Sequence, residues 1–315
     1  MRDGFGRDIS YLRLSVTDRC NYRCRYCMPA EGVCKRRREE ILSVEDCIAV
    51  AAAAAACGVT KVRVTGGEPL VRRGIVEICR GIAALPQIRE LCLTTNGSLL
   101  PQLAGPLREA GVDRLNISLD TLRPTRFAAL TRGGRLEDAL AGLAAAEAAG
   151  FRQLKLNVVL LGGVNDDEIA DFAALTREKP WQVRFIELMP MGPCADWPRE
   201  RFLSADAVLS RCPALQPVGA SGVAELYRLP GAAGTVGLIR PLSHRFCGGC
   251  DRIRVTADGR LKPCLHQAAE YPLRGLRGEA LEAAIRAAVA AKPRGHRLAD
   301  EGHSRAQRDM NEIGG

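Results

Sequence analysis

Short apolar runs alternate with longer alanine- and leucine-rich stretches over residues 1–190 of the chain. The short runs are typical of buried strands. They predict six strands, at Tyr11–Val16, Lys61–Val64, Glu90–Thr95, Arg114–Leu119, Gln153–Leu160 and Gln182–Ile186. The longer stretches predict helices between them, at residues 43–57, 75–85, 101–110, 136–149 and 166–176. Ser43, with an acid three residues later, marks the first helix start, and Gly58 marks its end.

This alternation sets the fold class. Strands that alternate with helices imply a parallel sheet with right-handed crossovers. Six units fall short of the eight that close a full barrel, so we expect an α/β fold with an open, partial (β/α)6 TIM-like barrel. From about Pro190, prolines interrupt the pattern, and the glycine-rich stretch 231–237 indicates turns. We therefore expect a barrel over residues 1–195 and a smaller C-terminal region over residues 196–315.

Several predicted strands carry a single cation between apolar neighbours. These cations are Arg13, Arg63, Lys155 and Arg184. A charge that points into a barrel costs several kcal/mol unless it is paired. Together they favour a lumen built for a polyanion, although any one of them could face solvent between helices. Arg252 and Arg254 occupy alternate positions, so on a strand they would point to the same face.

Composition adds a preference for the type of partner. The chain is 47% hydrophobic and 26% charged, as in ordinary globular proteins, and no apolar run is long enough to span a membrane. No signal peptide is visible, so a cytoplasmic location is expected. The formal net charge of +9 favours an anionic partner, either nucleic acid or a phosphorylated small molecule. An aromatic fraction of only 4% disfavours nucleic acid.

Two groups of three cysteines stand out among the 13 in the chain. The first is Cys20, Cys24 and Cys27, at C-x3-C-x2-C spacing after the first predicted strand; the second is Cys247, Cys250 and Cys264. Such short loops forbid most disulfide pairings, so metal ligation is the expected role. A [4Fe–4S] cluster usually takes four cysteines, and three leave one iron open. Zinc is the alternative for each group, with His266 as a fourth ligand for the second. The ungrouped cysteines are interpreted as small core residues, with Cys34 in doubt.

The first cysteine group resembles a known signature. C-x3-C-x2-C with an aromatic residue, Tyr26, before the last cysteine is similar to the motif of radical SAM enzymes, whose open iron holds S-adenosylmethionine. The flanking stretch 11–24 resembles the opening of the GTP 3′,8-cyclase family, with Tyr22 where that family more often has Phe. The resemblance runs from about Arg7 to the C-terminus. It implies a radical SAM barrel and two [4Fe–4S] clusters.

The resemblance implies a binding site for S-adenosylmethionine. Gly66-Gly67-Glu68-Pro69 looks like the family's GGEP motif, whose backbone and carboxylate meet the amino group of this cosubstrate. The alternative is a turn in which Glu68 caps the next helix. The implied cofactor-binding residues are Tyr26, Gly66, Gly67, Glu68, Asn96, Ser118 and Met189. Asn96 and Ser118 could equally complete the ends of their own strands.

The resemblance also implies contacts to GTP. The implied substrate-binding residues are Arg13, Arg63, Thr94, Lys155, Arg252 and Arg254, while Arg184 matches another charged barrel position. The second cysteine group resembles an auxiliary-cluster motif whose open iron meets the purine edge of GTP, with Asp251 in place of the usual Asn. In the family a C-terminal Gly-Gly pair, here Gly314-Gly315, reaches into the active site; otherwise it is a frayed tail.

The implied reaction converts GTP to 3′,8-cyclo-7,8-dihydro-GTP, the first step of molybdenum cofactor biosynthesis. A 5′-deoxyadenosyl radical takes the C3′ hydrogen of GTP, and Arg13 is the candidate catalytic residue. Implied partners are an electron donor of the flavodoxin or ferredoxin type, cyclic pyranopterin monophosphate synthase as the recipient of the product, and a second copy in a homodimer. The alternatives are another radical SAM enzyme with an auxiliary cluster, for example a peptide modifier, and a non-enzymatic nucleic-acid binder.

Overall fold

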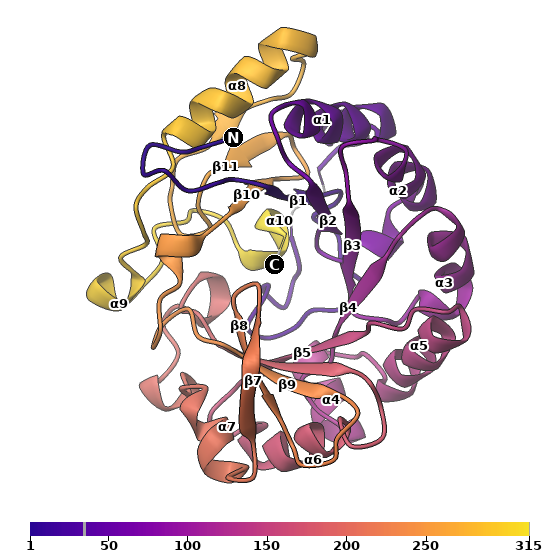
Figure 1. Cartoon of the computed structure of the whole chain (residues 1–315), viewed down its shortest axis with the longest axis vertical. Helices are drawn as coiled ribbons and strands as arrows, with labels where there is room; N and C mark the ends of the chain where they lie inside the picture. Colours follow the sequence, from indigo (N-terminus) through magenta and orange to yellow (C-terminus); the bar gives the residue numbers. More distant parts are fainter. Residues whose placement is uncertain (34–35, 315) are drawn as a thin grey trace.

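The computed structural model describes residues 1–33 and 36–314, and its parallel strands curve around the centre of the molecule (Figure 1). The six predicted strands are present as β1 (Tyr11–Ser15), β2 (Lys61–Thr65), β3 (Glu90–Thr95), β4 (Arg114–Ser118), β5 (Lys155–Leu160) and β6 (Gln182–Glu187). Each pairs in parallel with the next along the chain. The predicted open barrel of parallel strands is confirmed.

Helices cover the outside of this curved sheet (Figure 1). They are α1 (Val44–Ala56), α2 (Ile75–Ala83), α3 (Leu100–Glu109), α4 (Pro124–Thr131), α5 (Leu136–Ala148) and α6 (Ile169–Ala174). The start of α1 is as predicted, because Ser43 and Asp46 exchange side-chain and backbone hydrogen bonds. The sequence did not predict α4, which is too short to show a clear period; it begins with a proline and ends where Arg132 adopts φ = 53°.

The C-terminal region continues the same sheet. Its strands are β7 (Gln216–Ser221), β8 (Ala224–Arg228), β9 (Thr235–Ile239), β10 (Arg252–Val255), β11 (Arg260–Lys262) and β12 (Tyr271–Pro272). β9 pairs in parallel with β6, and β10 pairs in parallel with β1, so this region extends the barrel at both edges. Antiparallel strands β8 and β7 lie beyond one edge, and β11 and β12 lie beyond the other. The sheet therefore crosses the expected boundary at residue 195.

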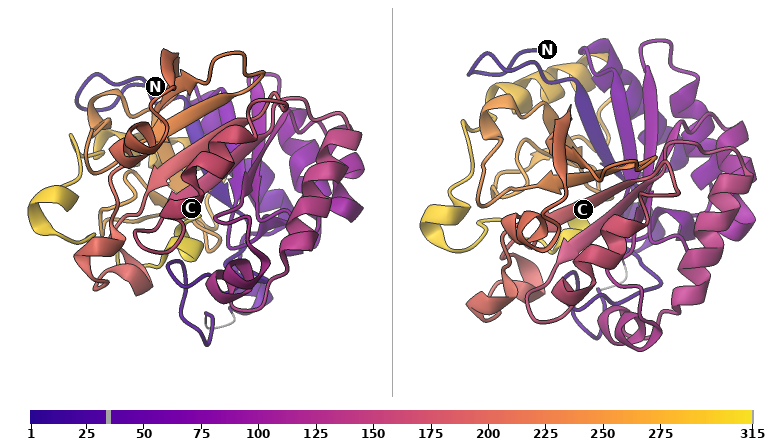
Figure 2. Two further views of the ribbon diagram at one scale, coloured as in Figure 1. Left: turned by 90° about the horizontal axis from the view of Figure 1, so that it is seen from below. Right: turned by 60° about the horizontal axis from the view of Figure 1, so that its bottom comes forward.

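The remaining helices pack around this extension. They are α7 (Asp206–Arg211), α8 (Gly278–Ala290), α9 (Leu298–Glu301) and α10 (Met310–Ile313). Figure 2 shows the helices of the first half on one side of the sheet, with the C-terminal segments at the opposite side. None of the helices described is long and apolar enough to cross a membrane.

The pleat of the strands separates an apolar outer face from a charged inner face. On β1, Leu12 and Leu14 are fully buried in the core between sheet and helices. Because successive side chains on a strand point to opposite faces, Tyr11 and Arg13 point into the barrel. The same alternation on β2 directs Arg63 inward, since its two neighbours belong to the core.

Six of the ungrouped cysteines are buried free thiols, as expected for small core residues. They are Cys47, Cys57, Cys79, Cys92, Cys194 and Cys212. Cys34 lies outside the described residues.

Candidate active site

The first cysteine group lies in the loop that follows β1. Cys20, Cys24 and Cys27 are free and partly exposed. Burial raises the pKa of Cys20 to about 11. Burial, followed by the charge of a neighbouring thiolate of the group, also raises the pKa of Cys24 and Cys27. The Cys27 N–H donates to the Cys24 carbonyl oxygen at 2.9 Å, so these two cysteines lie in one tight turn of the loop. A positive metal centre would favour their deprotonated form.

Two glycines bring the end of β2 against this loop. The Gly67 N–H donates to the Thr17 carbonyl oxygen at 2.8 Å, and the Glu68 N–H donates to that of Arg19 at 2.8 Å. A Cβ on Gly66 would lie 2.5 Å from the Thr17 oxygen, and one on Gly67 would overlap the Arg19 carbonyl. Glycine is therefore required at both positions for this close approach of the backbone.

The Glu68 carboxylate joins the ends of β2 and β3. It accepts hydrogen bonds from the Leu70 N–H at 3.1 Å, the Thr95 hydroxyl at 2.7 Å and the Asn96 N–H at 2.7 Å. Burial raises its pKa to about 7. The bond to Leu70 is the turn-capping contact that was the alternative to a cofactor role. Contact of Glu68 with S-adenosylmethionine stays a prediction.

A pocket beside the first cysteine group brings together three predicted cofactor-binding residues. Tyr26, Asn96 and Ser118 line it together with Cys24 and Asp120. The Tyr26 hydroxyl donates to Asp120 at 2.6 Å, and burial raises the pKa of Asp120 to about 6.

Asp120 lines the same pocket; it stands at the end of a predicted strand, where ligands were expected to gather, but no role had been assigned to it. Met189 lies beyond the end of β6, where its carbonyl oxygen accepts from the Cys194 thiol at 3.3 Å. Met189 does not line the pocket that Asp120 lines.

The second cysteine group lies next to β10. Cys247, Cys250 and Cys264 are free and partly exposed, and burial, with repulsion from the other two thiols, raises the pKa of Cys264. Hydrogen bonds from residues far apart in sequence fix the backbone around the second cysteine group. Arg7 Nη1 donates to the Cys247 carbonyl oxygen at 2.7 Å, and Lys292 Nζ donates to that of Pro263 at 2.6 Å.

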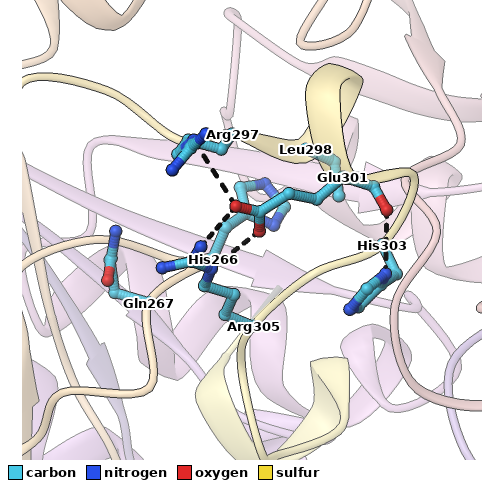
Figure 3. Close-up of a pocket in the computed structure, with 7 residues that line it drawn as sticks. All are labelled: His266, Gln267, Arg297, Leu298, Glu301, His303 and Arg305. Atoms are coloured by element: carbon cyan, nitrogen blue, oxygen red, sulfur yellow. Dashed lines mark hydrogen bonds and ion pairs between the residues drawn. The ribbon is translucent and has the colours of Figure 1, made fainter.

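A structural zinc ion would need a complete set of four protein ligands at either cysteine group. Among residues 1–33 and 36–314, no three His, Cys, Asp or Glu side chains are placed to hold one metal ion. His266 instead bonds Ser304 through Nδ1 at 3.1 Å. Next to it, Glu301 lies between Arg297 and Arg305 and forms ion pairs with both (Figure 3).

The predicted cations gather inside the barrel. Strand pairing places Arg13 beside Arg63 on one side and beside Arg254 on the other. Arg63 is 3% exposed, Lys155 6% and Arg184 9%, so the alternative that they face solvent is wrong. Arg63 Nη1 also donates to the Thr94 hydroxyl at 3.3 Å, so this predicted substrate contact lies in the same chamber.

Positive charge is in excess in this chamber. Glu90 forms ion pairs with Lys61, at 2.5 Å, and with Arg114. Burial and then the charge of Arg184 lower the pKa of Lys155 to about 6. Burial and then Arg63 lower the pKa of Arg184 to about 9. Cations that repel one another to this degree favour a bound polyanion.

Burial also lowers the pKa of two arginines on the paired strands β1 and β10. Burial, followed by the charge of Arg254, lowers the pKa of Arg13, and burial, followed by the charge of Arg252, lowers that of Arg254 to about 10. Arg252 packs over the ring of Phe246, 5.7 Å from its centre.

The C-terminal tail enters the barrel, with α10 at the centre of the molecule (Figure 1). Arg254 Nη1 donates to the Gly314 carbonyl oxygen at 2.9 Å. Gly314 adopts φ = 84°, and a Cβ there would lie 2.6 Å from a Thr65 methyl group. The predicted insertion of the tail is thus observed for Gly314, while Gly315 lies outside the described residues.

Known families account for most of the sequence. Residues 14–176 match the model of the Radical SAM superfamily, and residues 181–298 match that of Molybdenum Cofactor Synthesis C. The chain is 46% identical to GTP 3′,8-cyclase of Alkaliphilus oremlandii, with 100% of both chains covered. It is 49% identical to GTP 3′,8-cyclase of Peptoclostridium acidaminophilum, with 99% of this chain and 98% of that relative covered.

Solved structures show the same fold at low identity. The crystal structure of Streptococcus suis SuiB matches with a TM-score of 0.59 and 14% identity, covering 97% of this chain and 77% of that one. The crystal structure of HydG, a maturase of the [FeFe]-hydrogenase, matches with a TM-score of 0.50 and 16% identity, covering 64% of this chain and 48% of that one. These similarities concern the fold alone.

Proposed function

Because the chain belongs to the GTP 3′,8-cyclase family of radical SAM enzymes, we propose that its barrel binds GTP between the two cysteine groups. The chain is a GTP 3′,8-cyclase and catalyses the first step of molybdenum cofactor biosynthesis by a radical SAM mechanism. The observation that carries the proposed binding mode is the gathering of cations on the inner face of the barrel, where burial and then repulsion from neighbouring cations lower the pKa of Lys155 and Arg184.

Membership of the radical SAM superfamily implies that the chain binds a [4Fe–4S] cluster and S-adenosylmethionine. Cys20, Cys24 and Cys27 would hold this cluster, and the pocket lined by Tyr26, Asn96 and Ser118 would hold S-adenosylmethionine, with Gly66, Gly67, Glu68 and Met189 as further predicted contacts. When bound, they supply a 5′-deoxyadenosyl radical for removal of the C3′ hydrogen of GTP. The chain shields this site from water with the buried walls of the barrel.

The inner-face cations would bind the triphosphate and so position the ribose. Arginine forks suit bidentate contact with phosphate oxygens, whereas a lysine acts as a point charge. These residues are Arg13, Arg63, Lys155, Arg184, Arg252 and Arg254, with Thr94 beside them. A buried charge that is already in place costs no reorganisation when the anion arrives.

A second [4Fe–4S] cluster at Cys247, Cys250 and Cys264 is part of the proposal. Arg254 links this group to the chamber, since negative charge on Cys250 or Cys264 would act on its guanidinium. We further propose that residues 1–195 and 196–315 act as a radical SAM barrel and a cluster-binding region, and that Gly314-Gly315 contributes to catalysis. An electron donor of the flavodoxin or ferredoxin type, product transfer to cyclic pyranopterin monophosphate synthase, a cytoplasmic location and a homodimer stay predictions.

Anaerobic reconstitution tests the proposal. We expect iron for two clusters per chain, and we expect GTP to change the spectrum of a Cys20→Ser, Cys24→Ser, Cys27→Ser variant, which retains only the second group. With S-adenosylmethionine, dithionite and GTP, the wild-type enzyme should form the cyclised nucleotide. A single cluster per chain, or a spectrum that GTP leaves unchanged, would contradict the proposed role of the second group.

Arg13 is the proposed catalytic residue, because it lies between Arg63 and Arg254 on the inner face. Arg13→Ala should lose cyclised product and still release 5′-deoxyadenosine from S-adenosylmethionine. Both products are measured by chromatography in the same reaction. Unchanged turnover of GTP would remove Arg13 from the mechanism.

A further inference from the structure

Tyr11, the first residue of β1, stands among the cations of the barrel, and no motif assigned it a role. Its side chain is 6% exposed. Lys61 Nζ lies 5.1 Å from the centre of its ring, and the guanidinium carbons of Arg252 and Arg63 lie 5.5 Å and 5.9 Å from it. An aromatic face attracts cations at such distances. Tyr11 therefore helps to hold the chamber's cations in place.

The phenol of Tyr11 accepts a hydrogen bond but does not donate its own hydrogen to a described residue. Arg63 Nε donates to its oxygen, and a phenol can also donate its own hydrogen. In the part of the chain that the structure describes, no acceptor takes that hydrogen. The charged groups that face Tyr11 are Arg13 on β1, Lys61 and Arg63 on β2, Arg184 on β6, and Arg252 and Arg254 on β10. A guanidinium or ammonium group cannot accept it.

We propose that Tyr11 is a direct ligand of the nucleotide triphosphate, donating its phenolic hydrogen to a phosphate oxygen while its own oxygen holds Arg63 in place. This inference rests on the proposed binding of GTP in the barrel. The anion supplies the acceptor that the surrounding cations lack. A buried donor left without a partner costs free energy, so binding of the anion regains what the ligand-free chamber gives up.

The charges around Tyr11 give the proposal a pH signature. Burial raises the pKa of this phenol, but Arg63, Arg13 and Arg252 outweigh burial and lower it to about 8. Below this pH the neutral phenol can donate to phosphate. Above it the phenolate has no hydrogen to donate and repels the phosphate. GTP affinity should therefore fall as pH rises through about 8.

The test compares Tyr11→Phe with the wild type, both with reconstituted clusters. Tyr227→Phe is the matched control, because the Tyr227 hydroxyl also bonds an arginine, Arg240, but lies on β8 outside the chamber. Anaerobic calorimetry gives Kd for GTP and for guanosine between pH 7 and pH 9.5. Loss of one charge-assisted hydrogen bond should raise the Kd for GTP roughly ten-fold at pH 7. The Kd for guanosine should stay within about two-fold.

The two variants should also differ in pH profile. Lys155 gives the wild type and both variants the same decrease in GTP affinity with rising pH. The additional decrease above pH 8 should vanish in Tyr11→Phe alone. Equal loss of GTP and guanosine binding, or a wild-type pH profile in Tyr11→Phe, would overturn the proposal. A wild-type enzyme that binds no GTP would instead refute the proposed function. If Tyr11→Phe does not take up its clusters, 3-fluorotyrosine in the wild-type chain should move the break in affinity to lower pH, and an unmoved break would overturn the proposal.

Discussion

Burying a lysine without a carboxylate partner is costly, and Lys155 shows the consequence. Its Nζ lies 3.4 Å from the Ser221 hydroxyl, but burial, followed by the charges of Arg184 and Arg114, lowers its pKa to about 6. At pH 7.5 the lysine is therefore mostly neutral in the free enzyme. A triphosphate in the chamber would reverse the repulsion and restore the proton.

GTP binding should take up about one proton through Lys155 at pH 7.5, because the pKa of the lysine rises when the anion binds. Calorimetry in buffers of different ionisation enthalpy measures this uptake. Lys155→Met should lose most of the uptake and bind GTP about ten-fold more weakly, since one charged contact is removed. An uptake that is unchanged in Lys155→Met would show that the lysine does not meet the triphosphate.

A substitution at Gly67 tests the close approach of the end of β2 to the first cysteine loop. Gly67→Ala places a methyl group on the Arg19 carbonyl, so we expect a loss of about 1–3 kcal/mol in the free energy of unfolding. Denaturant unfolding and iron content measure stability and cluster binding. Gly105→Ala is the control, because a Cβ there meets no atom within 4 Å and should cost less stability than the methyl group at Gly67. Equal stability of the two variants would contradict the close approach.

The sequence was most informative for residues whose chemistry breaks a local pattern. Arg13, Arg63 and Lys155 are charges in apolar strands, and the structure places them in the barrel. Tyr11 was not identified for the opposite reason. A tyrosine on a strand is typical of an ordinary core residue, so only its environment in the folded chain distinguishes it.

At the scale of elements, local periodicity predicted the six βα units, but not the strands that extend them. β10 lies beside β1 although Arg252 and Tyr11 are separated by almost the whole chain. Prolines and glycines after residue 190 also hide the short strands β9 and β10. Pairing between distant segments depends on the completed sheet edge, which no local pattern encodes.

The short helix α10 depends on ion pairs outside itself. Arg308, just before this helix, pairs with Asp258 at 2.9 Å and with Glu270 at 2.7 Å. Arg36 pairs with Glu312, within the helix, at 3.3 Å. A helix of one turn is not stable alone, so these contacts hold the tail in the barrel.

Arg308→Ala should release the tail, because it removes both ion pairs that Arg308 forms with Asp258 and Glu270. If Gly314-Gly315 acts in catalysis, the yield of cyclised nucleotide should fall about ten-fold or more per 5′-deoxyadenosine formed, since about 1.4 kcal/mol corresponds to ten-fold. Chromatography of both products gives this ratio. Arg286→Ala, which removes an exposed pair with Glu282 on α8, should leave the ratio unchanged. A normal ratio in Arg308→Ala would mean that the tail docks without this pair.

In the whole molecule, the tail connects the two cysteine groups. Negative charge on Asp309 raises the pKa of Cys27 after burial, which places the start of the tail near the first group. The Gly314 carbonyl oxygen accepts a hydrogen bond from Arg254. Negative charge on Cys250 and Cys264 of the second group acts in turn on the Arg254 guanidinium. The cationic chamber thus lies between two sites that come from opposite ends of the chain.

In the proposed function, the phosphates of GTP offset part of the positive charge of this chamber. A ligand that binds only the folded state at 100 times its Kd adds about 2.7 kcal/mol of stability. We expect GTP to raise the Tm of the reconstituted enzyme, GDP to raise it less and guanosine hardly at all, because the gain comes from phosphate charge. Added salt should reduce the differences among the three ligands, since it screens the chamber's mouth. Equal Tm shifts with guanosine and GTP would show that the nucleoside supplies the binding free energy. The inner-face cations would then bind an anion other than the triphosphate of GTP.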